Sequence, residues 1–87
     1  MVTQKTKIVN EQGMHMRPAS LMTQKLAKYA STVNIVYNGK SFNAKSVMML
    51  MSACMKYGSE VEVKADGPDE NEALKEVVDF IDSGLGD

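Results

Sequence analysis

The sequence predicts an α+β fold, a two-layer open-faced sandwich in which a four-stranded antiparallel sheet carries three helices on one face. Segments with alternating and with helical spacing follow one another in the order strand, helix, strand, strand, helix, strand, helix. An Asn-Gly pair joins two of the strands as a tight hairpin. Each helical segment has one apolar stripe, and a sheet packed against all three stripes would bury them together.

The first strand and the first helix flank a turn that ends at Gly13. Thr and Lys alternate from Thr3 onward before Ile8 and Val9, which predicts an edge-compatible strand over residues 3–9. A helix is expected from Pro18 to Tyr29, because apolar residues recur there at helical spacing. These apolar residues are Ala19, Met22, Leu26 and Tyr29 or Ala30, with Gln24, Lys25 and Lys28 left for solvent.

The middle of the chain contains the hairpin and a short helix. The β-branched run Thr32 to Tyr37, the turn Asn38-Gly39 and residues 40–43 predict the antiparallel pair. Ser46 then opens a methionine-rich segment that has no β-branched residue after Val47, which favours a helix over residues 47–57 that Gly58 closes.

The last strand and helix are separated by Gly67-Pro68-Asp69. Residues 60–65 alternate as a strand with one solvent-facing side. The acidic residues Asp66, Asp69 and Glu70 are interpreted as ordinary complements of the dipole of the following helix, and Gly84 is expected to stop that helix. Its apolar stripe consists of Leu74, Val77, Val78 and Ile81.

Composition indicates one small domain over residues 1–87 and argues against several classes of protein. The hydrophobic fraction of 44% is enough for a packed core, and a net charge of −1 gives no bulk attraction to nucleic acid. Cys54 is the single cysteine, so no internal disulfide can form, and a reduced thiol in the cytoplasm is expected. No stretch resembles a secretory leader or a membrane span.

His15, the only histidine, is a candidate phosphoryl acceptor. It stands just ahead of Pro18, whose fixed backbone angle suits a first helical turn, so unpaired backbone N–H groups that bind anions should lie beside it. The positive end of the helix favours the neutral, nucleophilic imidazole, and Arg17 supplies a fixed cation for a phosphate. The alternative is a histidine that only caps the helix or faces solvent.

The motif Gly13-Met14-His15-Met16-Arg17-Pro18-Ala19 resembles the active-site signature of the histidine-containing phosphocarrier (HPr) family of the bacterial sugar phosphotransferase system. The resemblance covers the whole chain. Residues 43–48 are similar to the segment around the family's regulatory serine, and weaker similarities lie at residues 37–40 and at the acidic opening of the last helix.

The resemblance implies that His15 accepts a phosphoryl group from phosphorylated enzyme I and passes it to a sugar-specific enzyme IIA, with Arg17 helping to hold the group. The protein would be a covalent phosphotransfer intermediate and not an enzyme, without a metal or other cofactor, and most simply a monomer. The sequence leaves open which ring nitrogen is phosphorylated and which sugars are served.

Ser46 has two interpretations. Serine is a favoured helix N-cap and needs no other reason to stand there. The resemblance implies regulatory phosphorylation by a dedicated kinase and phosphorylase, although the serine also occurs in family members from organisms without that kinase. A phosphate on Ser46 would gain from the helix dipole and from Lys45, and its charge would repel acidic partners.

The methionines around the two helix starts suggest a docking surface, because flexible and polarizable side chains suit contact with several partners. The alternative is that they fill the core. Met16 replaces the small residue that usually follows the family's histidine, so partner affinity is expected to differ. The positions that correspond to the family's docking patch are Met16, Arg17, Ser20, Gln24, Val47, Met48 and Met51.

Two other functions differ from the phosphocarrier in the residues that they require. A regulatory paralogue would act through phosphorylated Ser46 as a corepressor of a catabolite-control transcription factor, but such relatives typically lack the histidine that this chain has at position 15. A small-molecule binding module or hydrolase would require a second histidine, a metal-ligand cluster or a serine with a general base. The sequence offers none of these three.

Overall fold

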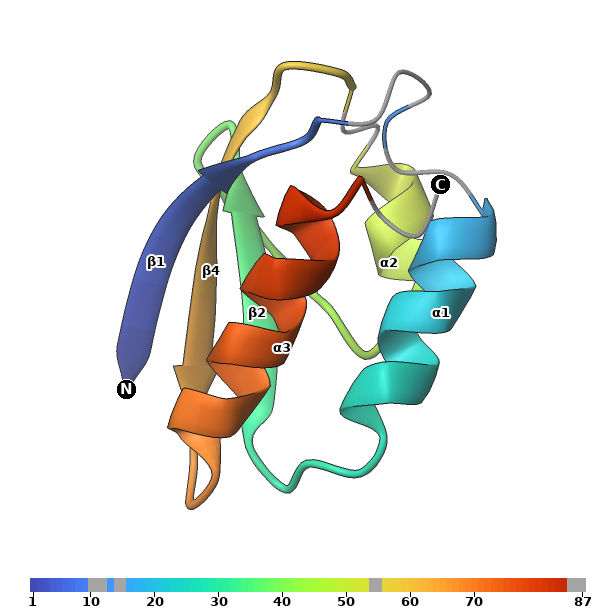
Figure 1. Ribbon diagram of the computed structural model, residues 1–87. Helices are drawn as coiled ribbons and strands as arrows, with labels where there is room; N and C mark the ends of the chain where they lie inside the picture. The colour runs from blue at the N-terminus through green and yellow to red at the C-terminus, as the bar shows by residue number, and fades with distance from the viewer. Residues whose placement is uncertain (10–12, 14–15, 54–55, 85–87) are drawn as a thin grey trace.

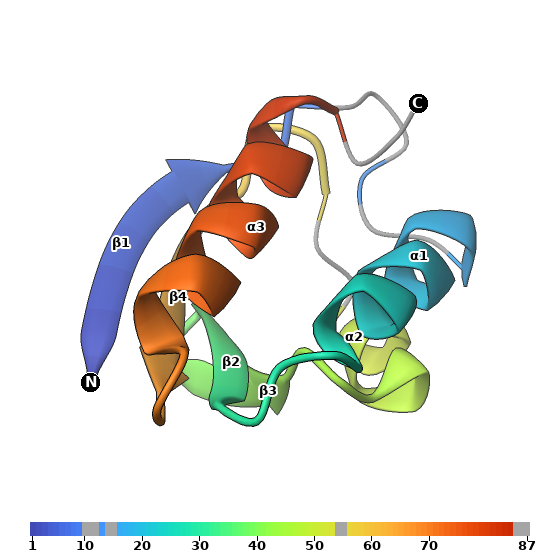
Figure 2. The same ribbon diagram turned by 60° about the horizontal axis from the view of Figure 1, so that its bottom comes forward.

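The computed structural model describes residues 1–9, 13, 16–53 and 56–84, and within them the predicted α+β sandwich is confirmed. Four strands form an antiparallel sheet in the order β1-β4-β2-β3. Three helices lie together on one face of the sheet (Figures 1 and 2). The strands are β1 Val2–Lys7, β2 Thr32–Tyr37, β3 Lys40–Asn43 and β4 Glu60–Asp66, and the helices are α1 Met16–Leu26, α2 Val47–Ser52 and α3 Glu70–Asp82.

The β2–β3 hairpin forms as its turn predicts. Asn38 and Gly39 adopt φ values of +53° and +76°, the two left-handed conformations that a type I′ turn needs to match the twist of its strands. Within the sheet, Ile35 of β2 lies opposite Val63 of β4, and both side chains are fully buried. The turn itself fixes the register of β2 with β3, in which Ile35 lies opposite Phe42.

Each helix buries an apolar stripe against the inner face of the sheet. The fully buried side chains include Met22 and Leu26 of α1, Leu50 of α2 and Ile81 of α3. Removing each such side chain from water contributes roughly 1.5–3 kcal/mol before the entropy of ordering it is subtracted. Among the described residues, none of the helices has the length and apolar character that crossing a bilayer requires.

The predicted limits of α1 were wrong at both ends. The helix begins at Met16, ahead of Pro18, and ends at Leu26 instead of Tyr29. At its end, Tyr29 N–H donates to the carbonyl of Leu26, a shorter turn than the helical one. The chain then leaves the helix because the next two backbone N–H groups, of Ala30 and Ser31, donate to Asp69.

The predicted limits of α2 and β1 also require correction. Helix α2 ends at Ser52, well before Tyr57, and Gly58 already contacts the residue that follows β1. Gly58 N–H donates to the carbonyl of Ile8 over 2.8 Å, and its φ of +82° allows a turn at this residue. The strand β1 ends at Lys7, two residues earlier than predicted, and Ile8 enters the core.

The apolar stripe of α3 differs in part from the prediction. Leu74 is half-buried, while Ala73 and Phe80 are buried together with Val77. Ala73 and Phe80 stand four residues before and three residues after Val77, so all three lie on one side of the helix. The small Ala73 gives little signal in a pattern of large apolar residues. Gly84 follows the helix with φ +90° and stops it as expected.

Candidate functional site

The predicted acceptor motif spans the start of α1. Gly13 is buried and adopts φ +68°, a left-handed conformation that agrees with the glycine-marked break expected ahead of the helix. His15 lies outside the described residues. It stands immediately before Met16, the first residue of α1, and so directly precedes the end of the helix that carries the positive partial charge.

The first turn of α1 contains Arg17 and Pro18. The side chain of Pro18 is fully buried, and its missing N–H costs no hydrogen bond, since first-turn N–H groups have no partner within a helix. Arg17 is exposed. A guanidinium and the N–H groups of a first turn together attract an anion, so this end of α1 has the composition of a phosphate site.

Exposed methionines gather on α1 and α2. Met16 and Met48 are 66% and 83% exposed, whereas Met22 is 1% exposed. Core filling therefore explains Met22 and does not explain Met16 or Met48. Helices α1 and α2 pack against each other on one side of the molecule (Figure 2), so the two exposed side chains belong to neighbouring helices.

The other predicted docking residues differ in exposure. Along α1, Ser20 is half-buried and Gln24 is exposed, and with Met16 they form a row at four-residue spacing. On α2, Met51 is exposed, but Val47 is half-buried and packs against the core. Val47 therefore helps to anchor α2 on the core and offers less surface to a partner than Met48 does.

Helix α2 starts beside the far half of α1. The ammonium of Lys45 donates to the carbonyl of Tyr29, just beyond the end of α1, over 2.7 Å, and α2 then runs back toward the start of α1 (Figure 1). The sequence could not show whether the two helix starts are neighbours. The structure shows that Ser46 lies toward the end of α1 that is remote from Met16.

Ser46 is the N-cap of α2. Its Oγ accepts a hydrogen bond from Met49 N–H over 3.3 Å, and its backbone is extended, as an N-cap requires. Its side chain is half-buried. The predicted role of Ser46 as an N-cap is thus confirmed. Lys45, which was expected to assist a phosphate on Ser46, is already engaged with Tyr29 and would have to share its ammonium.

Comparison with known proteins places this fold and motif in one family. The family model described as the PTS HPr component phosphorylation site, where PTS denotes the phosphotransferase system, matches residues 2–83. The chain belongs to the HPr family. HPr from Thermoanaerobacter tengcongensis aligns with a TM-score of 0.93 and 39% identity over 100% of this chain and 98% of that protein. HPr from Bacillus anthracis aligns with a TM-score of 0.87 and 30% identity, over 92% and 95% of the two chains.

A catabolite-repression relative is similar as well. Crh from Bacillus subtilis, solved as a swapped, intertwined dimer, aligns with a TM-score of 0.78 and 38% identity over 97% of both chains. Its identity to this chain is close to that of the Thermoanaerobacter protein. Sequence identity alone therefore does not separate the phosphocarrier from this relative, and the HPr family is the level at which the comparisons agree.

In this HPr-family chain, Asp69 has a structural role that the sequence analysis missed. Its carboxylate accepts hydrogen bonds from the backbone N–H groups of Ala30 and Ser31, at 3.0 and 2.9 Å, and from the Ser31 hydroxyl. It makes no side-chain cap on its own helix. The Ser31 hydroxyl and these N–H groups lower the pKa of Asp69. Asp69 thus joins the start of α3 to the segment that follows α1.

Asp66 and Glu70, the other acidic residues of this group, lie by the N-terminus. The terminal ammonium is 3.1 Å from Glu70 Oε2 and 3.7 Å from Asp66 Oδ1. The hydrogen bond to Glu70 is the main cause that raises the pKa of the terminal amine. The expected role as complements of the helix dipole is incomplete, because all three carboxylates also make long-range contacts.

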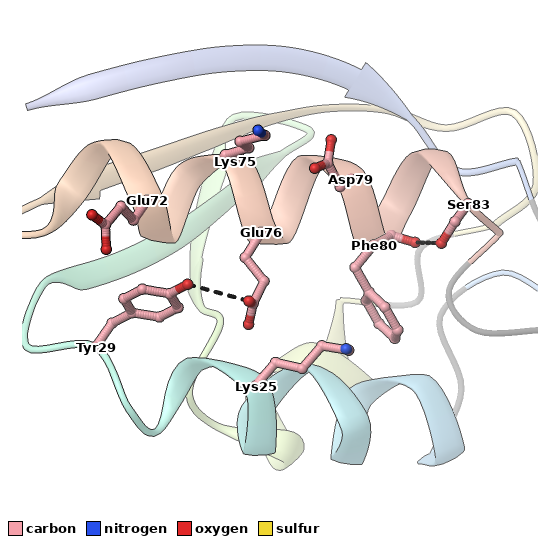
Figure 3. A pocket seen from close by; sticks show the side chains of 8 residues that line it. All are labelled: Lys25, Tyr29, Glu72, Lys75, Glu76, Asp79, Phe80 and Ser83. Carbon is pink, nitrogen blue, oxygen red and sulfur yellow. Dashed lines mark hydrogen bonds between the residues drawn. The ribbon is translucent and has the colours of Figure 1, made fainter.

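A groove of about 590 Å³ runs between α1 and α3 (Figure 3). The carboxylate of Glu76 accepts a hydrogen bond from the Tyr29 hydroxyl over 3.2 Å and pairs with Lys28 at 3.1 Å. Burial, followed by this hydrogen bond, raises the pKa of Tyr29. None of the predicted site residues that the structure describes lines the groove, and the contacts of Glu76 join α3 to the segment that follows α1.

Among the described residues, no group of three or more His, Cys, Asp or Glu side chains is placed to hold a metal ion.

Proposed function

We propose that this HPr-family chain carries a phosphoryl group on His15, which receives the group from phosphorylated enzyme I and passes it to a sugar-specific enzyme IIA. One observation carries the proposal. The single histidine of a chain that matches the PTS HPr phosphorylation-site model directly precedes α1, and Arg17 and Pro18 follow it in the first turn.

The chemistry requires positioning and charge neutralisation more than covalent assistance. A ring nitrogen of His15 forms a bond to phosphorus while the bond from phosphorus to the donor breaks. The phosphoryl oxygens would receive hydrogen bonds from first-turn N–H groups and the charge of Arg17. Transfer to enzyme IIA breaks the P–N bond, with the ring as leaving group, so the chain serves as a covalent intermediate and not as an enzyme.

The α1–α2 surface is proposed as the docking site for both partners in turn. Two observations support this proposal. Helices α1 and α2 pack against each other, and α1 directly follows His15 in the chain. The exposed side chains on these helices include Met16, Arg17, Gln24 and Met48. One surface that serves a donor and an acceptor successively must be vacated after each transfer. A monomer satisfies this requirement most simply, since no second copy covers the surface. We place this carrier in the cytoplasm.

Phosphorylation of Ser46 is proposed as a regulatory step. Esterification of the capping Oγ would leave phosphate oxygens to accept the Met49 N–H, so α2 would keep a cap. The added charge of roughly −1.5 to −2 would lie at the start of α2, on the docking surface, and would repel acidic partners. A dedicated kinase and phosphorylase would be required to add and remove the group.

A second candidate is a regulatory paralogue that binds a catabolite-control transcription factor through phosphorylated Ser46. The 38% identity with Crh favours it. His15 favours the carrier, because such paralogues typically lack this histidine. The two functions differ in whether enzyme I phosphorylates the chain.

The deciding experiment is incubation with phosphoenolpyruvate and catalytic enzyme I, followed by intact mass measurement before and after acid treatment. We expect one acid-labile phosphoryl group in the native chain and none in His15→Ala. Ser46→Ala is the matched control and should gain the group normally. Absence of any gain, with an enzyme I shown to be active on another HPr, would favour the regulatory paralogue.

A further inference from the structure

The exposed methionines of the α1–α2 surface are accessible to oxidants. The side chain of Met48 is more exposed than that of Met16, and both are far more exposed than that of Met22, which is buried. Met1 is also exposed, but it stands at the start of β1, on the opposite side of the molecule from α1 and α2 (Figure 1). Among the described residues, exposed thioethers therefore lie on the proposed docking surface and, at Met1, remote from it, whereas the thioether of Met22 is shielded.

We propose that Met16 and Met48 are sites of reversible oxidation by peroxides, and that their sulfoxides weaken docking of the phosphotransfer partners. The second part rests on the proposed function. Each thioether sulfur attacks a peroxide oxygen, the O–O bond breaks, and one oxygen atom is transferred to sulfur. With hydrogen peroxide the other product is water, so sulfur loses two electrons and the peroxide gains two. A methionine sulfoxide reductase reverses the change.

The consequence for docking follows from polarity. A thioether adapts its shape to an apolar partner surface, whereas a sulfoxide brings a strong acceptor oxygen that must find a donor when it is buried. An unpaired polar group in an interface reduces affinity by about tenfold or more. The fold should not change, because Met16 and Met48 contribute little buried area to the core.

Site mapping tests the first part without any phosphotransfer assay. The folded native chain is treated with hydrogen peroxide for increasing times, digested, and each methionine is followed by mass spectrometry. We expect Met16 and Met48 to oxidise at least about tenfold faster than Met22, because a buried thioether reacts only after local opening. Equal rates at Met22 and Met48 would overturn the proposal.

A transfer assay tests the second part. The initial rate of phosphorylation by enzyme I at subsaturating chain concentration is measured before and after oxidation, and the ratio is compared with that of the Met16→Leu, Met48→Leu double variant. The native chain should lose about tenfold and recover with methionine sulfoxide reductase. The variant keeps the less exposed Met49 and Met51 of α2, at 39% and 36%, so it should lose clearly less than the native chain relative to its own reduced form.

The outcomes separate this proposal from the proposed function. If the reduced chain accepts no phosphoryl group, the proposed function fails while the mapping result stands by itself. If the reduced chain is phosphorylated and oxidation at Met16 and Met48 leaves its rate unchanged, the proposed effect on docking is wrong. An equal loss in the double variant would likewise overturn it.

Discussion

Replacing Gly67 by alanine should destabilise the protein far more than the same change at Gly58. Gly67 adopts φ +152°, and a Cβ built there would lie 2.6 Å from the backbone Cα of Ser31. Backbone strain of this kind costs about 1–3 kcal/mol, and forced overlap in a packed region costs a similar amount. Together they predict a loss of about 4 kcal/mol. Gly58 also has positive φ, but its added Cβ would have no atom within 4 Å, which predicts about 1–2 kcal/mol.

The comparison of the two variants isolates the contact with Ser31. Because the chain contains no tryptophan, urea unfolding is followed by far-UV circular dichroism, and the free energy of unfolding is obtained by linear extrapolation. A loss of about 4 kcal/mol also corresponds to a fall in Tm of roughly 15–30 °C. If Gly67→Ala and Gly58→Ala differ by less than about 0.5 kcal/mol, the close approach of Gly67 to Ser31 is not what makes the glycine necessary.

Three further perturbations test the junctions and the surface. The pKa of Asp69 in the folded protein is lowered from its ordinary value of 3.8. Ionised Asp69 therefore stabilises the folded state above that pH, and this contribution is lost as the pH falls through the folded pKa. Asp69→Asn should flatten the acid limb of the free energy of unfolding, measured by urea unfolding as a function of pH. Leu50→Ala should cost about 2–5 kcal/mol of unfolding free energy, whereas Met48→Ala should change it by less than about 0.5 kcal/mol while slowing phosphorylation by enzyme I. Ser46→Ala should cost about 1 kcal/mol through loss of the cap, and a larger loss would contradict a role limited to capping.

The order of the elements and the hairpin register could be predicted because they depend on local physics. The twofold alternation of β2 and the left-handed turn at Asn38-Gly39 follow from residues adjacent in the chain. Element limits depended on distant contacts and were less predictable. Helix α1 ends where Asp69 binds the backbone of Ala30 and Ser31, and beyond α2 the backbone of Gly58 is bound to Ile8.

The candidate site was predictable in part for the same reason. The presence of a helix start close to Pro18 and the N-cap at Ser46 have local signatures in the sequence, although α1 begins two residues earlier than predicted, at Met16. The relative direction of α1 and α2 has no local signature, because it depends on packing and on the contact between Lys45 and Tyr29. The role of Asp69 was hidden, since a carboxylate at the beginning of a helix has a sufficient local explanation.

Onward transfer is the most direct test that the chain is a phosphocarrier. The chain is phosphorylated with labelled phosphoenolpyruvate, freed of enzyme I and unreacted phosphoenolpyruvate, and mixed with a compatible enzyme IIA, and the label on each protein is followed over time. The label should leave the native chain and appear on enzyme IIA in equal amount, and His15→Ala should take up none at the first step. Label that stays on the chain in acid-stable form, or that His15→Ala also acquires, would contradict the carrier function.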